Sequence, residues 1–76
     1  MNIEKRVKEI MSKIFHVSEL SIKNDSRMNE LMGWDSLGHM NLITSLEQEF
    51  NIALSDDDVS QMISVELILD ILKNYL

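Results

Sequence analysis

Glycine and proline, on which tight turns depend, are nearly absent from this sequence. Its 76 residues include two glycines, Gly33 and Gly38, and no proline. This scarcity favours helices and argues against a β-sheet joined by tight turns. The chain also has no cysteine, which excludes disulfide bonds and metal sites built from thiolates. A domain this short must be stabilised by its core alone, and with 5% aromatic residues that core is expected to be aliphatic.

Four segments repeat their apolar residues with the spacing of an α-helix. The first runs over about residues 2–15, and the second from residue 35 or 36 to about residue 50. A short third helix is expected at 56–62 and a fourth at roughly 65–75. The last three each begin at a residue type that commonly caps helices: Asp35, Ser55 and Ser64. The pattern predicts an all-α four-helix bundle with a long first loop and a short third helix, folded as one domain over residues 1–76.

Residues 16–35 connect the first two helices and show little periodicity. A connection of this length is uncommon in a compact domain unless it has a function or packs on its own. Ser18 is expected to cap a short turn within it. Its apolar side chains are expected to attach it to the core: Val17, Leu20, Ile22, Met28 and Leu31.

The net charge of −6 is unevenly distributed along the chain. Residues 1–23 carry five basic and three acidic side chains, whereas residues 24–76 carry two basic and ten acidic ones. Such a surface repels nucleic acid and anionic membranes, and it attracts basic partners. No apolar run approaches the ~20 residues that span a bilayer, and residues 1–6 lack the apolar core of a signal peptide. We therefore expect a cytoplasmic protein that neither binds nucleic acid nor inserts into a membrane.

The second helix begins within the segment Gly33-Trp34-Asp35-Ser36-Leu37. Asp35 is a good N-cap, since its carboxylate can accept hydrogen bonds from the free N–H groups of the first turn. Ser36 follows in that turn, where the backbone N–H groups and the helix dipole favour a negative group. The serine hydroxyl is therefore predicted to be exposed and suited to carry a phosphate group.

Two other kinds of chemistry at these residues are disfavoured by their spacing. Asp35, Ser36 and His39 lie within one helical turn, so nothing independent orients the imidazole toward the serine, and no second loop supplies an oxyanion hole. No catalytic residue is therefore assigned, and His39 is expected to be partly buried and hydrogen-bonded locally. The acids at 56–58 lack the spaced Asp-x-Asp-x-Asp-Gly loop that binds calcium, so no metal site is predicted.

On a helical wheel that places Leu37 at 0°, the second helix has two apolar sides. The core side, at about 140° to 240°, holds Leu42, Ile43, Leu46 and Phe50. Leu37 and Met40, with Thr44 between them, lie on nearly the opposite side. Single exposed apolar residues are common, but this pair also suits a docking patch for partners, with Glu47 and the acids at 30 and 35 on its rim. The fourth helix has one apolar stripe: Val65, Ile68, Leu69, Leu72 and Leu76.

These features resemble those of the acyl carrier proteins, and the resemblance covers essentially the whole chain. Asp35-Ser36-Leu37 matches the attachment motif of that family, and residues 42–50 are similar to its second helix, which ends in a Glu-Phe pair. Residues 51–58 and 64–68 resemble the segments that begin its third and fourth helices. The resemblance implies a four-helix bundle of acyl-carrier type, and a carrier rather than an enzyme.

The resemblance also implies roles for individual residues. A phosphopantetheinyl transferase would move 4′-phosphopantetheine from coenzyme A to the hydroxyl of Ser36, and the terminal thiol would hold an acyl group as a thioester. Asp35 would cap the helix and meet the metal or basic groups of the transferase. Leu37 and Met40 would give apolar docking contacts and Glu47 would add charge. The implied partners are the transferase and acyl-loading and acyl-using enzymes with basic docking surfaces; the carrier is expected to be a monomer whose core could enclose part of an acyl chain.

The second helix departs from this family where carriers of fatty acid synthesis are more acidic, at Gly38, His39, Asn41, Ser45 and Gln48. The pathway is therefore open between fatty acid, polyketide and specialised synthesis, while Asp35 favours acyl over peptidyl cargo. Gly38 in the first turn also costs about 1 kcal/mol of helix stability relative to alanine. The alternative is an unmodified helical interaction module that docks a partner through Leu37 and Met40.

Overall fold

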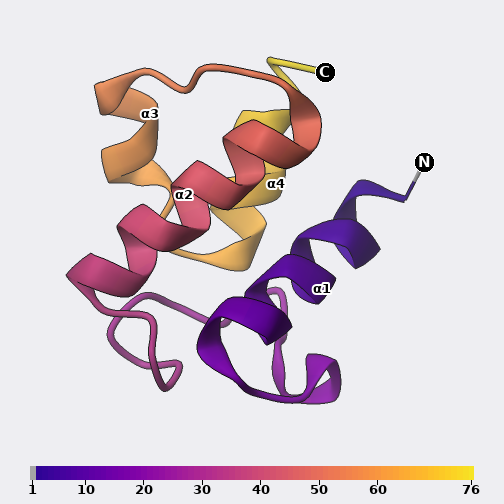
Figure 1. Cartoon of the computed structure of the whole chain (residues 1–76), viewed down its shortest axis with the longest axis vertical. Helices are drawn as coiled ribbons and strands as arrows, with labels where there is room; N and C mark the ends of the chain where they lie inside the picture. Colours follow the sequence, from indigo (N-terminus) through magenta and orange to yellow (C-terminus); the bar gives the residue numbers. More distant parts are fainter. Residues whose placement is uncertain (1) are drawn as a thin grey trace.

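The computed structural model of the chain describes residues 2–76, which form four α-helices and one short 3-10 helix (Figure 1). In chain order these elements are α1 (Ile3–Phe15), η1 (Glu19–Ser21), α2 (Ser36–Phe50), α3 (Asp56–Gln61) and α4 (Val65–Leu72). α1 packs against α2, and the connection between them loops around the end of the bundle where α2 begins (Figure 1). The predicted all-α, four-helix architecture is confirmed. Within the described residues, no helix is long and apolar enough to cross a membrane.

The helices begin at the residues that the sequence marked as caps. The carboxylate of Asp35 accepts a hydrogen bond from the N–H of Gly38 at 2.8 Å, which satisfies one of the free donors at the start of α2. The hydroxyl oxygens of Ser55 and Ser64 cap α3 and α4 in the same way. Asn51 ends α2 in the left-handed conformation, with φ of 54°, as asparagine commonly does.

The fourth helix ends at Leu72 and not near residue 75 as predicted. Beyond it the chain tightens into a turn in which the N–H of Tyr75 donates to the carbonyl of Leu72 at 3.0 Å. The Tyr75 hydroxyl donates to the carboxylate of Asp58 in α3 and accepts from the N–H of Ser55. These bonds turn the end of the chain toward α3. Leu76, which the apolar spacing placed in the stripe of the fourth helix, is consequently 57% exposed.

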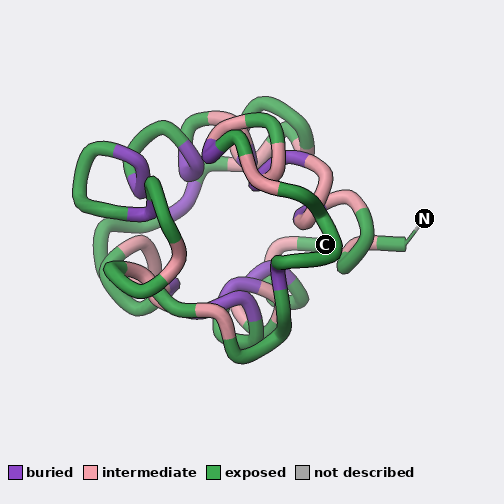
Figure 2. Tube along the Cα trace, turned by 90° about the horizontal axis from the view of Figure 1, so that it is seen from below, coloured by how far each residue is buried: buried purple, intermediate pink, exposed green. Residues whose placement is uncertain are grey.

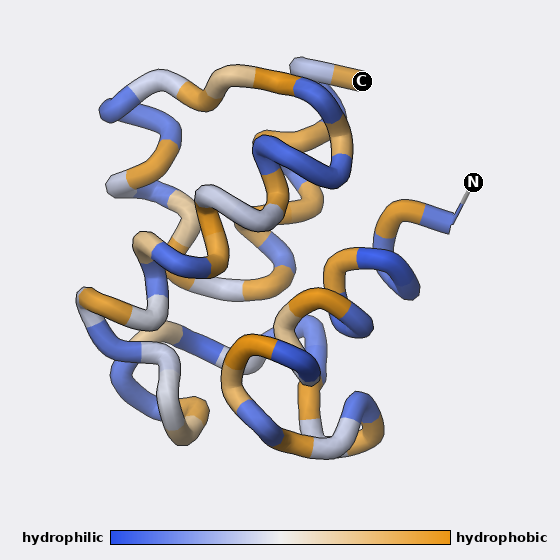
Figure 3. The backbone as a smooth tube through the Cα atoms, in the orientation of Figure 1, coloured by the Kyte–Doolittle hydropathy of each residue, from blue (hydrophilic) through white to orange (hydrophobic). Residues whose placement is uncertain are grey.

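The helices and the first connection surround a common interior, and their buried positions lie on the inner side (Figure 2). Hydrophobic and hydrophilic residues alternate along α1 and α2 with the helical period (Figure 3). The predicted core side of α2 is confirmed, since Leu42, Ile43 and Leu46 are buried and Phe50 is half-buried. The core is mainly aliphatic but also contains two aromatic side chains, and its buried apolar residues are Val7, Ile10, Met11, Phe15, Ile22, Trp34, Leu42, Ile43, Leu46, Leu54, Met62, Val65, Ile68 and Leu72.

The first connection is attached to the core by four of the five predicted residues, and by one that was not predicted. Val17, Met28 and Leu31 are half-buried and pack against the core. Ile22 is buried as expected, but Leu20 is 85% exposed because it lies in η1 on the outside of the loop. Trp34, near the end of the connection, is 1% exposed and belongs to the core. The loop is also hydrogen-bonded to the segment between α3 and α4, where the N–H of Met28 donates to the carbonyl of Ile63 at 2.9 Å. This anchoring fixes the position from which α2 begins.

Candidate functional site

Ser36 is the first residue of α2 and its side chain is exposed. It follows directly on Asp35, whose carboxylate caps the N–H of Gly38 and whose carbonyl accepts from the N–H of His39 at 2.7 Å. The first N–H groups of an α-helix have no partner within the helix, and the dipole makes this end positive. A phosphate ester on the Ser36 oxygen would therefore lie in a favourable field at the start of a 15-residue helix. The exposure predicted for this hydroxyl is confirmed.

The backbone reaches this corner through a very close approach between the loop and the helix. Gly33 has φ of 88°, in the left-handed region that favours glycine. A Cβ atom on Gly38 would lie 2.1 Å from the carbonyl oxygen of Gly33 and 3.0 Å from the ring of Phe15. Alanine therefore does not fit at position 38. The close packing at Gly38 opposes the helix-propensity cost, so alanine is expected to destabilise the fold here, against the sign that propensity alone predicts.

Behind Ser36, three ring side chains form a stack that supports the corner. The rings of Phe15 and Trp34 are 5.9 Å apart, and those of Trp34 and His39 are 6.2 Å apart, with interplanar angles of 21° and 22°. The indole N–H of Trp34 donates to Nδ1 of His39 at 3.0 Å, and Nε2 of His39 lies 2.9 Å from the carbonyl oxygen of Val59 in α3. Nδ1 is therefore the acceptor and Nε2 carries the proton.

This arrangement corrects the expectation for His39. The imidazole is 6% exposed, which makes it buried rather than partly buried. Its partners are Trp34 and the backbone of Val59, the latter 20 residues away, so its hydrogen bonding is not purely local. Both ring nitrogens are engaged in the interior, and neither is available to accept a proton from the Ser36 hydroxyl.

The outward side of α2 exposes the two apolar residues that the wheel placed there. Leu37 is 73% exposed and Met40 is 54% exposed. Met32, in the loop just before the serine motif, is 80% exposed and was not predicted. Glu47 is only half-buried, but Oε2 of its carboxylate accepts a hydrogen bond from the N–H of Leu54 at 2.8 Å. Glu47 therefore also holds the loop after α2, a role that a helical wheel cannot show.

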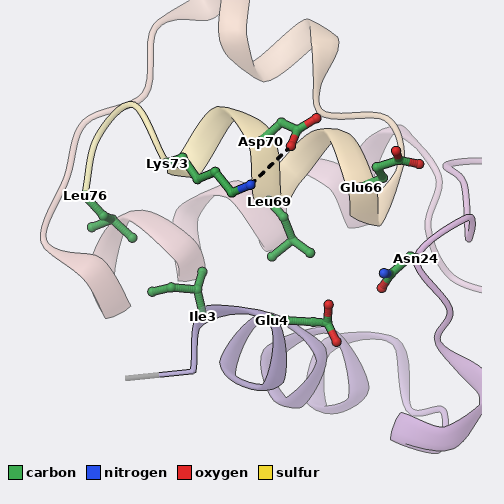
Figure 4. Close-up of a pocket in the computed structure, with 8 residues that line it drawn as sticks. All are labelled: Ile3, Glu4, Asn24, Glu66, Leu69, Asp70, Lys73 and Leu76. Carbon is green, nitrogen blue, oxygen red and sulfur yellow. Dashed lines mark ion pairs between the residues drawn. The ribbon is translucent and has the colours of Figure 1, made fainter.

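Two further regions of the described chain lie apart from this corner. A hollow of about 480 Å³ lies between the first turn of α1 and α4, and no residue of α2 lines it (Figure 4). Asp70 and Lys73, on its α4 side, form an ion pair at 3.7 Å. At the start of α3, the carboxylate of Asp58 accepts a hydrogen bond from the Tyr75 hydroxyl. Among residues 2–76, no group of three or more histidine, cysteine, aspartate or glutamate side chains is arranged to hold a metal ion.

Comparison with known proteins gives two consistent findings. The model of a family described as the phosphopantetheine attachment site matches residues 5–72. A protein named acyl carrier protein from Buchnera aphidicola subsp. Baizongia pistaciae (strain Bp) is 39% identical over 74 residues, which are 97% of this chain and 95% of the relative. Another of that name, from Buchnera aphidicola subsp. Schizaphis graminum (strain Sg), is 34% identical over 73 residues, which are 96% of this chain and 92% of the relative.

Proposed function

The chain belongs to the acyl carrier protein family, and from this premise we propose that Ser36 is the residue that carries its 4′-phosphopantetheine. Proteins of this family are carriers, not enzymes, and their phosphopantetheine is a covalent prosthetic group. The single observation that carries the assignment is the exposed hydroxyl of Ser36 in the first turn of α2. The free N–H groups and the positive helix end there match a phosphate ester in charge and in hydrogen bonding.

In this proposal the chain contributes position rather than catalysis. Ser36 supplies the hydroxyl oxygen that forms the new phosphate ester. The diphosphate bond of coenzyme A breaks, adenosine 3′,5′-bisphosphate leaves, and the hydroxyl proton passes to a base of the transferase. His39 cannot assist as a base because both of its nitrogens are engaged in the interior, so a phosphopantetheinyl transferase supplies the catalytic groups. The prosthetic group ends in a thiol that holds an acyl group as a thioester. Asp35, as the cap of α2, keeps the first turn formed and places a negative charge beside the hydroxyl for the metal or basic groups of the transferase.

We expect partners to dock on the outward side of α2, through Leu37, Met40 and the charge of Glu47. The exposure of the two apolar side chains beside Ser36 supports this role. The partners are the transferase and acyl-loading and acyl-using enzymes with basic surfaces, which complement a chain whose residues 24–76 carry ten acidic and two basic side chains. The cargo is an acyl group of fatty acid, polyketide or specialised synthesis. The carrier acts as a cytoplasmic monomer, with residues 1–76 as one carrier domain, and without binding nucleic acid or inserting into a membrane.

Intact mass measurement tests the attachment site. The purified chain is incubated with coenzyme A and a broad-specificity phosphopantetheinyl transferase, and the wild type is expected to gain the mass of one phosphopantetheine. Ser36→Ala should gain nothing, whereas Ser45→Ala on the same helix should load as the wild type does. An unchanged wild-type mass would contradict the carrier function and favour an unmodified module that docks through Leu37 and Met40. A gain that persists in Ser36→Ala would contradict the site.

The docking side is tested by two matched leucine substitutions. Leu37→Ala should slow loading by the transferase, because it removes an exposed apolar contact beside the serine. Leu20→Ala is the control, since it removes the same side chain from another exposed position, in η1. Neither substitution should change the free energy of unfolding by more than about 0.5 kcal/mol. Equal loading rates for the two variants would contradict a docking role for Leu37.

A further inference from the structure

The interior immediately behind Ser36 is filled by aromatic rings rather than by flexible aliphatic chains. Trp34 is 1% exposed, and Phe15 and His39 are each 6% exposed. The three rings stack in sequence, Trp34 between the other two, at centroid distances of 5.9 and 6.2 Å. Flat rings packed in this way leave less room for adjustment than methionine side chains would, because each ring turns about two side-chain bonds and methionine about three.

Polar bonds close the same region between α2 and α3. The indole N–H of Trp34 donates a hydrogen bond to Nδ1 of His39, and Nε2 of His39 donates to the carbonyl oxygen of Val59. An aliphatic chain passing between these helices beside His39 would separate donors from acceptors and offer no hydrogen bond in return. Buried polar groups that lose their partners are costly, and a connected set of them more so. The region therefore resists an apolar guest more strongly than an apolar core would.

The backbone closes the space between the first turn of α2 and the loop that precedes it. The first turn of α2 lies so near the preceding loop that a single methyl group on Gly38 would overlap the carbonyl oxygen of Gly33, at 2.1 Å. The same methyl group would press on the ring of Phe15, at 3.0 Å. Space for even one carbon atom is therefore missing at this point, two residues along the helix from the Ser36 hydroxyl.

From this packing we infer that the acyl group carried on Ser36 stays outside the helical core, so that the cargo of this chain is short or polar. The inference rests on the proposed attachment at Ser36. A long aliphatic chain excluded from the core would remain in water, where exposed apolar surface is unfavourable. A short or polar acyl group has little apolar surface and carries no such penalty. The Phe15–Trp34–His39 stack is thus a specificity determinant for the cargo, and it acts by exclusion.

The single tryptophan of the chain makes this inference directly measurable. Butyryl, octanoyl and dodecanoyl forms are prepared by transfer from the corresponding acyl-coenzyme A, and each is compared with the unacylated holo form in Tm and in Trp34 emission. A chain that binds only the folded state would raise Tm. We expect the same Tm and the same emission maximum in all forms. A Tm that rises with chain length and a shift in Trp34 emission would overturn the inference. A Tm rise without an emission change would place the chain elsewhere, as in the hollow between α1 and α4, and would equally overturn it.

Two substitutions test whether the stack is the cause. His39→Ala removes the hydrogen-bonded link between α2 and α3 but keeps Trp34 as the probe. In this variant octanoylation is expected to raise Tm above that of its own butyryl form. Phe15→Leu removes the ring on the opposite side of Trp34 and leaves both hydrogen bonds of His39 in place. It is the second test variant if His39→Ala does not fold. No chain-length effect in either folded variant would show that the stack does not exclude the cargo. Failure of the wild type to load any phosphopantetheine would instead contradict the proposed function.

Discussion

The indole N–H of Trp34 donates a hydrogen bond to Nδ1 of His39 at 3.0 Å, in the interior directly behind the proposed attachment serine. Trp34 comes from the end of the first connection and His39 from the first turns of α2. His39 continues the link to the carbonyl of Val59 in α3. One buried imidazole therefore joins three segments, and it sets the position of the helix end on which Ser36 stands.

Replacing Trp34 with phenylalanine should destabilise the fold by about 1–3 kcal/mol, because Nδ1 of His39 then loses its donor in a buried place. Denaturant unfolding followed by circular dichroism measures this cost. The double variant Trp34→Phe/His39→Leu removes both partners of the bond, so its cost should be smaller than the sum of the two single costs. Strictly additive costs would indicate that the two rings do not interact energetically.

Alanine at position 38 should lower the free energy of unfolding, although alanine is the better helix former by about 1 kcal/mol. The physical reason is the 2.1 Å approach of its Cβ atom to the carbonyl oxygen of Gly33, which forces the loop away from α2. Asn41→Ala, at an exposed position of the same helix, is the control and should be neutral or slightly stabilising. Stabilisation by Gly38→Ala would mean that the loop yields without cost.

Gly38 also shows where sequence reasoning succeeds and where it stops. The helical period and the caps at Asp35, Ser55 and Ser64 depend on residues that are near one another in the chain, so the helices and their starts could be predicted. The environment of Gly38 depends on Phe15 and Gly33, which belong to other elements. A propensity scale contains no such information, and it therefore gives the opposite sign.

The candidate site divides in the same way. The exposure of Ser36, Leu37 and Met40 follows from the wheel and the helix start, and it could be predicted. The burial of Trp34 could not, because it lies in a connection without periodicity and its partners are Phe15 and His39 in two different helices. A tryptophan beside the motif in a chain with 5% aromatic residues was the one available signal of an anchoring role.

Two substitutions of Asp35 separate its capping role from its charge. Asp35→Ala removes the acceptor for the N–H of Gly38 and should cost about 1 kcal/mol of stability, whereas Asp35→Asn keeps an oxygen acceptor and should cost little. If the charge also assists transfer to Ser36, Asp35→Asn should load more slowly than the wild type at equal stability. Thermal unfolding and initial loading rates measure the two effects. Wild-type loading by Asp35→Asn would limit Asp35 to capping.

The ion pair between Arg6 in α1 and Glu49 in α2 should make the free energy of unfolding depend on pH. The guanidinium donates a hydrogen bond to the carboxylate at 2.7 Å, and this bond lowers the pKa of Glu49 below its ordinary value. A carboxyl with a lowered pKa in the folded state contributes stability above its unfolded pKa, and this contribution is lost as pH falls through the folded pKa.

The free energy of unfolding of the wild type and of Glu49→Gln, measured over a range of pH, tests the direction of this pH dependence. The wild type should be the more stable at neutral pH, and the difference should narrow once the pH falls below about 4. Added salt should reduce the difference, because the pair lies at the surface. A difference that is constant from neutral to acidic pH would mean that the Glu49 charge contributes nothing.

Glu47 combines the proposed docking charge with a structural hydrogen bond, so its two roles must be separated by the choice of substitution. Glu47→Lys reverses the charge but also takes the acceptor away from the N–H of Leu54, which should cost about 1 kcal/mol of stability. Glu47→Gln keeps an oxygen acceptor and removes only the charge. Its loading rate should therefore fall at low salt and approach the wild-type rate at high salt, where surface charges are screened.

Glu66→Gln, which removes one exposed charge from α4, is the matched control and should have a smaller effect. A loss of rate in Glu47→Gln that does not depend on salt, or an equal loss in Glu66→Gln, would argue against electrostatic steering by α2.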